Sequence, residues 1–106
     1  MRRRTDIDRV FRGGRHNSGR LLAVRSLATD LKVSRYAFSV SRRVGNAVVR
    51  NRVRRRLREA ARSLAVHEGF DIVIVARPEA ATSDFHGLKA ELSLLFGRAR
   101  MLAVPG

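Results

Sequence analysis

The sequence predicts a small α+β fold, an α/β sandwich in which helices pack against a short sheet in the order α-β-β-α-β-α. Apolar residues recur at helical spacing in residues 7–11, 49–64 and 85–96. Residues 36–41 instead alternate in the manner of a strand, and residues 71–76 form a continuous apolar run. The chain has 106 residues, of which 44% are hydrophobic. We therefore expect one domain with one core, spanning residues 1–106.

The first helix is expected to begin at Thr5, which can cap it ahead of two acids in the first turn. Its apolar face is formed by residues at positions i, i+3 and i+4: Ile7, Val10 and Phe11. Gly13-Gly14 ends the helix.

Two strands should follow. Residues 20–27 predict the first, and residues 29–34 a turn. In the second strand, residues 36–41, alternation places Tyr36, Phe38 and Val40 on one face. The opposite face then carries small side chains, Ala37, Ser39 and Ser41.

The next helix is strongly basic. Residues 42–62 contain nine arginines and one acid, Glu59, so this stretch carries +8 of the formal net charge of +14. Asn46, after Gly45, is a suitable N-cap, and the helix is expected to run to about Val66, with Gly69 as its terminator. Its narrow apolar stripe consists of Val49, Val53, Leu57, Ala60 and Leu64.

This charge distribution points to an anionic partner. Solvated helices interleave acids and bases because like charges four residues apart destabilise a helix, yet Arg50, Arg54 and Arg58 follow one another at that spacing. Arginine also holds phosphate with two parallel hydrogen bonds. A membrane is the weaker option, because no apolar run approaches the ~18 residues of a membrane-spanning helix.

The carboxyl-terminal part supplies scaffold. Residues 71–76 predict a strand buried on both faces, which Arg77-Pro78 ends. Ser83 or Asp84 can cap a last helix, whose buried stripe is Phe85, Leu88, Leu92, Leu95 and Phe96. The strand–helix–strand order favours a parallel unit, for which a right-handed crossover is the default.

Residues typical of an independent nuclease are missing. The nine acids are scattered, and the three histidines, His16, His67 and His86, fall in three different elements without ligand spacing. There is no cysteine, and Arg2, Arg3 and Arg4 are not followed by an apolar signal segment, which fits a cytoplasmic protein. The residues alone therefore predict a binding module without a catalytic site.

Residues 36–59 resemble the signature region of the bacterial ribonuclease P protein subunit. Arg50-Asn51-Arg52 matches the R-N-R core of that signature, and Gly45, Asn46, Ala47 and Val48 match its lead-in. The similarity extends over the chain, through Val10-Phe11 in the first helix and the strand that ends in Ala76-Arg77.

This resemblance implies a fold like domain 2 of ribosomal protein S5, with a left-handed crossover in place of the default. It implies a ribonucleoprotein that removes the 5′ leader from precursor tRNA. The expected partners are ribonuclease P RNA and precursor tRNA, without a membrane. Mg²⁺ is needed by the RNA subunit, which carries the hydrolysis, and no cofactor is expected on the protein alone. The sequence leaves the oligomeric state open.

The resemblance also implies two sets of site residues. The candidates for contact with the RNA subunit are Arg42, Arg43, Arg50, Asn51, Arg52, Arg54, Arg55, Arg56 and Arg58. The candidates for a cleft that holds the leader are Ile7, Phe11, Arg25, Ser39 and Ser41. Ile7 and Arg25 stand where aromatic residues are common in the family, which predicts a leader grip with more charge and less stacking.

Other interpretations stay open at this point. Phe11 can be plain core, Ser39 and Ser41 can be small for packing alone, and Arg42-Arg43 can be a solvated pair. A ribosomal or other RNA- or DNA-binding module without a role in tRNA processing would bind duplexes independently of ribonuclease P RNA. A stand-alone nuclease is the third alternative, against which the scattered acids argue.

Overall fold

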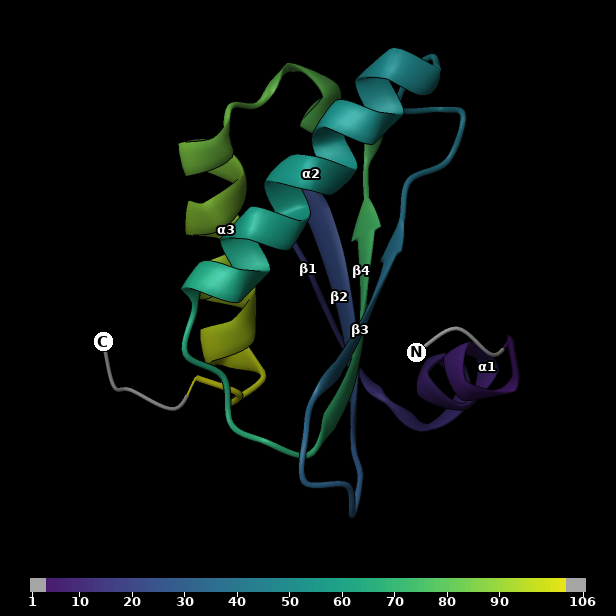
Figure 1. Ribbon diagram of the computed structural model, residues 1–106, viewed down its shortest axis with the longest axis vertical. Coiled ribbons are helices and arrows are strands. Elements are labelled where there is room, and N and C mark those ends of the chain that lie inside the picture. The colour runs from purple at the N-terminus through teal and green to yellow at the C-terminus, as the bar shows by residue number, and fades with distance from the viewer. Residues whose placement is uncertain (1–3, 103–106) are drawn as a thin grey trace.

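A mixed four-stranded sheet forms the centre of the computed structural model, which describes residues 4–102 (Figure 1). Arg2 and Arg3 lie outside the described residues. The elements are α1 (Arg4–Gly13), β1 (Arg15–Ser18), β2 (Leu22–Ala28), β3 (Arg35–Ser39), α2 (Ala47–Ser63), β4 (Phe70–Ala76), the 3-10 helix η1 (Pro78–Thr82) and α3 (Phe85–Arg98). None of the helices in this described part is long and apolar enough to cross a bilayer.

The strands lie in the order β1-β2-β4-β3, so β3 is an edge strand. β1 pairs with β2 and β2 with β4 in antiparallel fashion, whereas β3 runs parallel to β4. In Figure 1, α2 lies in front of the sheet, both parallel strands run upward, and β4 lies to the left of β3 at the arrowheads. The crossover is therefore left-handed, contrary to the default. β3 pairs with the edge of β4 that β2 leaves free, and α2 crosses on the face opposite α1. This combination of edge and face makes the crossover left-handed.

The main core lies between the sheet and the two helices α2 and α3. Side chains alternate along β2 and β4, so that Val24 and Ile74 point to these helices and are fully buried. The same core contains Leu22, Val53, Leu57, Ile72, Leu88, Leu92, Leu95, Phe96 and Met101. The helical stripes predicted for α2 and α3 thus supply one layer of a two-layer sandwich.

α1 packs on the opposite face of the sheet, against β2 and β4 (Figure 1). Val10 of α1 and Val73 of β4 are both buried on this side. An ion-pair network ties the layers together: Arg35 of β3 donates two hydrogen bonds to the buried carboxylate of Asp71, at 2.8 and 2.6 Å, and lies 3.7 Å from Asp6 of α1. The hydrogen bonds that Arg35 donates to Asp71 raise the pKa of Arg35 above its ordinary value.

Helix boundaries differ in part from the prediction. Asn46 caps α2 as predicted, and its side chain accepts a hydrogen bond from the Val49 amide at 3.0 Å. However, α2 ends at Ser63, because Leu64 adopts an extended backbone and Val66 pairs with Leu102 in an isolated bridge. Gly69 is therefore not its terminator.

Helix α1 spans Arg4–Gly13, whereas the sequence predicted a start at Thr5. Thr5 therefore lies inside α1 and does not cap it. The cap of α3 is Asp84, which accepts from the Gly87 amide at 2.8 Å.

Strand boundaries also differ. β1 was not predicted, because RHNS has no apolar alternation, and pairing with β2 alone makes it a strand. β2 begins at Leu22, two residues later than predicted, and β3 ends at Ser39, so that Val40 and Ser41 lie beyond it. A 3-10 turn with Pro78 at its start follows β4.

Candidate nucleic-acid interface

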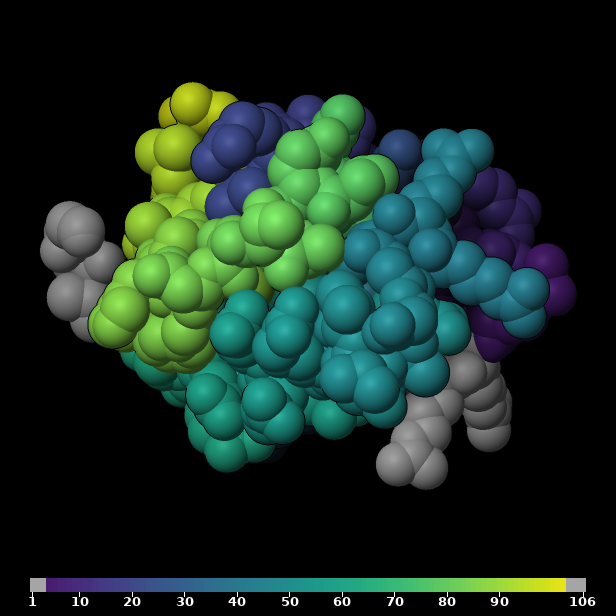
Figure 2. Space-filling view, turned by 90° about the horizontal axis from the view of Figure 1, so that it is seen from above, coloured from purple at the N-terminus to yellow at the C-terminus, as the bar shows by residue number. Residues whose placement is uncertain are grey.

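Helix α2 is exposed along its length, between the η1–α3 segment and the loop that follows β3 (Figure 2). The arginines of α2 from Arg52 onward divide into three groups according to which neighbour they contact. Two groups flank the helix on either side, and the third lies on its outer crest.

The first group is the β3-side column, which we define as Arg54, Arg58 and Arg62. These residues are one helical turn apart and lie on the side of α2 that is next to β3. An Nη2 atom of Arg54 lies 3.5 Å from the carbonyl oxygen of Val40, and the guanidinium carbon of Arg58 lies 6.0 Å from the centre of the Phe38 ring. Arg62 borders the same depression as Tyr36.

The second group reaches the opposite side of the helix. Arg52 donates to the carbonyl oxygen of Ala81 at 3.4 Å, and Arg56 to that of Ser83 at 2.8 Å. These bonds hold α2 against η1 and the start of α3. Between the two groups, Asn51 and Arg55 are exposed on the crest, and Asn51 accepts a hydrogen bond from Arg54 at 3.1 Å.

The positive charge of α2 is not balanced within the described residues. Both ion pairs found in residues 4–102 involve Arg35, and none involves an arginine of α2. In addition, the Nε atoms of Arg50 and Arg52 are buried without a hydrogen-bond partner. Arg42 and Arg43 are exposed in the turn before α2 and extend the same basic surface.

The predicted leader residues lie on the other face of the sheet. Strand register places Arg25 opposite Val73, and Val73 opposite Ala37, so their side chains share a face. The next row along the strands consists of Ala23, Val75 and Ser39. These residues have small side chains, and they form an open strip of sheet beside α1.

Phe11 and Arg25 form one unit on this face. The guanidinium carbon of Arg25 lies 4.7 Å from the centre of the Phe11 ring, and its Nη1 atom lies 3.4 Å from the Phe11 carbonyl oxygen. Phe11 is 41% exposed, so it is not plain core. Ile7, one turn earlier on α1, is half-buried, and Ser41 is exposed beyond the end of β3.

Two neighbours of these sites were not among the predicted residues. His16 on β1 pairs with Arg25 and is exposed on the same face. Arg62 completes the β3-side column, and its spacing of four residues after Arg58 was a usable signal. His16 gave no such signal, because β1 itself was not predictable.

Four of the carboxylates have structural contacts. Asp6 and Asp71 pair with Arg35, and Asp84 caps α3. Glu91 accepts from the amides of Leu21 and Leu22 at 2.7 and 2.6 Å. In the part of the chain from residue 4 to residue 102, no three histidine, aspartate or glutamate side chains gather as a metal site would require.

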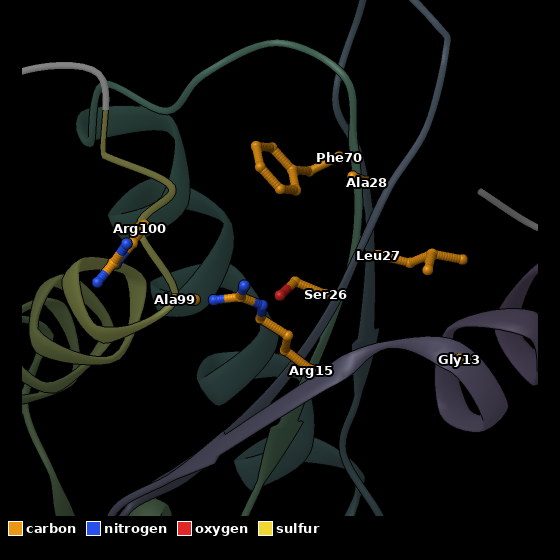
Figure 3. Close-up of a pocket in the computed structure, with 8 residues that line it drawn as sticks. All are labelled: Gly13, Arg15, Ser26, Leu27, Ala28, Phe70, Ala99 and Arg100. Carbon is orange, nitrogen blue, oxygen red and sulfur yellow. The ribbon is translucent and has the colours of Figure 1, made fainter.

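A separate cavity of about 360 Å³ opens between the start of β1 and the end of α3 (Figure 3). Arg15, Ser26 and the ring of Phe70 line it, together with Arg100, which has a positive φ of 58°. In Figure 3 the Arg100 side chain points away from Arg15, so the two guanidinium groups do not converge on one point.

The comparisons with known proteins agree on one family. The family model described as Ribonuclease P matches residues 1–100. A ribonuclease P protein component of Dehalococcoides mccartyi is 37% identical over 103 residues, which cover 97% of this chain and 86% of the relative. That of Acidothermus cellulolyticus is 43% identical over 102 residues, covering 92% and 85%. The solved RNase P protein of Thermotoga maritima superimposes with a TM-score of 0.84 at 27% identity, covering 100% of this chain and 97% of that one.

Proposed function

The chain belongs to the Ribonuclease P family, and from this membership we propose that it is the protein subunit of a ribonucleoprotein that removes the 5′ leader from precursor tRNA. The observation that carries the proposal is the family match over residues 1–100, which includes both α2 and the side of the sheet that carries Arg25. The unbalanced arginines of α2 support an RNA partner, because phosphate contacts dominate protein–nucleic acid affinity.

We further propose that the RNA subunit carries the hydrolysis and binds the Mg²⁺ that it requires. The structural contacts of Asp6, Asp71, Asp84 and Glu91 support this division, since each of these carboxylates already binds a backbone amide or an arginine. The protein contributes by offsetting phosphate repulsion and by holding the substrate.

The two faces of the sheet suggest separate roles. The arginines of α2 and the exposed pair Arg42-Arg43 contact the RNA subunit. The strip of small side chains beside α1 holds the single-stranded leader, with Phe11 and Arg25 at its border and Ser39 on its floor. A strip of small residues suits this role, because the backbone of a single strand can approach the sheet closely there.

Reconstitution with the cognate RNA subunit and a precursor tRNA tests the proposal. The protein alone should not cleave at any Mg²⁺ concentration, the RNA alone should cleave at high Mg²⁺, and the protein should lower that requirement. Arg55→Ala should reduce the effect, whereas Arg98→Ala, an equal loss of charge at an exposed site on α3, should not. Cleavage by RNA-free protein would refute the division of roles, and an absence of any stimulation would refute the function.

A further inference from the structure

A depression of about 300 Å³ lies between the edge strand β3 and the second half of α2, and the role proposed for the α2 arginines leaves its aromatic residues unexplained. We call it the aromatic groove and define it by the residues that line it: Tyr36, Phe38, Arg58, Ala61 and Arg62. It lies on the α2 side of the sheet, continuous with the β3-side column.

The floor of the groove is aromatic. Tyr36 and Phe38 are two residues apart on one strand face, with ring centres 6.2 Å apart and planes within 10° of parallel. Both rings are half-buried, so one part packs on the core while another part lines the groove. The two rings are therefore stacked on each other, and a nucleobase can extend such a stack.

The walls of the groove are cationic. Arg58 lies with its guanidinium carbon 6.0 Å from the centre of the Phe38 ring, and Arg62 follows one turn later. Both side chains are exposed, and neither forms an ion pair within residues 4–102. Aromatic floor and arginine walls together match the two parts of a nucleotide, the base and the phosphate.

A purely structural role explains this arrangement less well. Phe85 on α3 is also a half-buried aromatic residue next to the core, but its ring neighbour is His86. Within residues 4–102, no arginine forms a cation–π contact with Phe85. Core packing alone therefore accounts for Phe85. It does not account for two stacked rings that line a depression together with Arg58 and Arg62.

We propose that the aromatic groove binds one unpaired nucleotide of the ribonuclease P RNA, whose base stacks on Tyr36 and Phe38 while Arg58 and Arg62 hold the adjoining phosphates. The proposal rests on the function proposed above and adds a site to it. The RNA subunit is the source, because the groove adjoins the arginines of α2. The leader residues Arg25 and Ser39 lie on the opposite face of the sheet.

The sequence offers a direct probe, because Tyr36 is the only tyrosine of the chain. Full-length protein labelled with 3-fluorotyrosine therefore gives a single ¹⁹F resonance from the groove. Addition of the RNA subunit should shift this resonance, and RNA containing 4-thiouridine should crosslink to Tyr36 or Phe38 under ultraviolet light. An unchanged resonance together with an absence of crosslinks, in protein that still stimulates cleavage, would overturn the groove and leave the function intact.

Variants provide the energetic test. Replacing both rings by leucine should weaken binding of the RNA subunit by about 5- to 150-fold, the equivalent of one lost base stack. Phe38→Tyr, which keeps an aromatic ring, should retain affinity, and Phe85→Leu serves as the matched control for loss of a half-buried ring. Equal losses in the control, or crosslinks found only to the leader of precursor tRNA, would contradict the assignment. Wild-type protein that neither binds the RNA nor stimulates cleavage would instead refute the proposed function.

Discussion

At the scale of single residues, arginines with the same charge differ in what holds them. Arg56 donates to the Ser83 carbonyl oxygen at 2.8 Å, whereas Arg55 is exposed on the crest and makes no hydrogen bond or ion pair within residues 4–102. The first side chain therefore contributes to the fold as well as to the surface charge. The second is available to a partner without breaking an internal contact.

This difference predicts separable effects of two substitutions. Arg56→Ala should lower the free energy of unfolding by about 1 kcal/mol through the lost hydrogen bond, and should also weaken RNA binding. Arg55→Ala should weaken binding with little change in stability. Thermal unfolding and RNA titration of both variants would check this. Equal stability of the two variants would show that the Ser83 contact contributes nothing.

Arg25 is stacked on Phe11, so the proposed leader site predicts that these two residues act as one unit. Arg25→Ala should reduce the preference for precursor over mature tRNA, and it should lower the salt dependence by about 0.7 in slope, the value of one single-strand phosphate contact. Arg25→Tyr should keep the preference, because a ring can stack on a base, and should reduce the slope. The measurement is affinity for both tRNAs across salt. Unchanged discrimination in Arg25→Ala would mean that this strand does not contact the leader.

Tyr36 has a pKa raised above its ordinary value of 10.0, because burial disfavours the phenolate. Spectrophotometric titration of this single tyrosine should give a midpoint above 10.0 in the folded protein and near it in denaturant. Since the folded-state pKa is the higher one, the associated stability is present below pH 10 and is lost as pH rises through the folded value. A midpoint at or below 10.0 in the folded protein would place Tyr36 in full contact with water.

At the scale of elements, the hydrophobic pattern predicted α1, α2, α3 and three of the four strands, because each buries one apolar face or stripe. It did not predict β1, whose residues Arg15–Ser18 are polar or charged and depend on pairing with β2. The sequence pattern also could not predict that the α2 arginines separate onto two sides of the helix. This separation depends on which neighbours lie beside the helix, η1 on one side and β3 on the other.

The junction between α1 and β1 predicts a strong effect of a small substitution. A methyl group at Gly14 would lie 2.5 Å from the Val10 carbonyl oxygen and 2.6 Å from that of Ser26. Neither oxygen can move away without disturbing α1 or β2. Gly14→Ala should therefore destabilise the protein by about 1–3 kcal/mol, measured by denaturant unfolding. Gly13→Ala, whose added methyl group would lie 3.8 Å from Leu27, is the matched control and should be close to neutral.

At the scale of the whole molecule, the net charge of +14 should make RNA binding steeply dependent on salt. With roughly five phosphates neutralised, the logarithm of the affinity for the RNA subunit should fall with the logarithm of salt at a slope of about −3.5 to −4.5. Arg52→Ala or Arg54→Ala should each reduce this slope by about one contact. A salt-independent affinity would exclude phosphate contacts as the source of binding.

The ion pair between Arg35 and Asp71 has a consequence for both of the surfaces proposed to bind RNA, although it belongs to neither. These two residues are register partners in the parallel pair of β3 and β4. Side chains alternate along a strand, so a slip of β3 by one position would turn Ser39 toward the helices and Phe38 toward α1. The bidentate contact therefore holds β3 in one register, which sets the direction of every side chain along this strand. It fixes which side of this five-residue strand faces α1, where we propose that the leader binds, and which faces α2, where we propose that the RNA subunit binds.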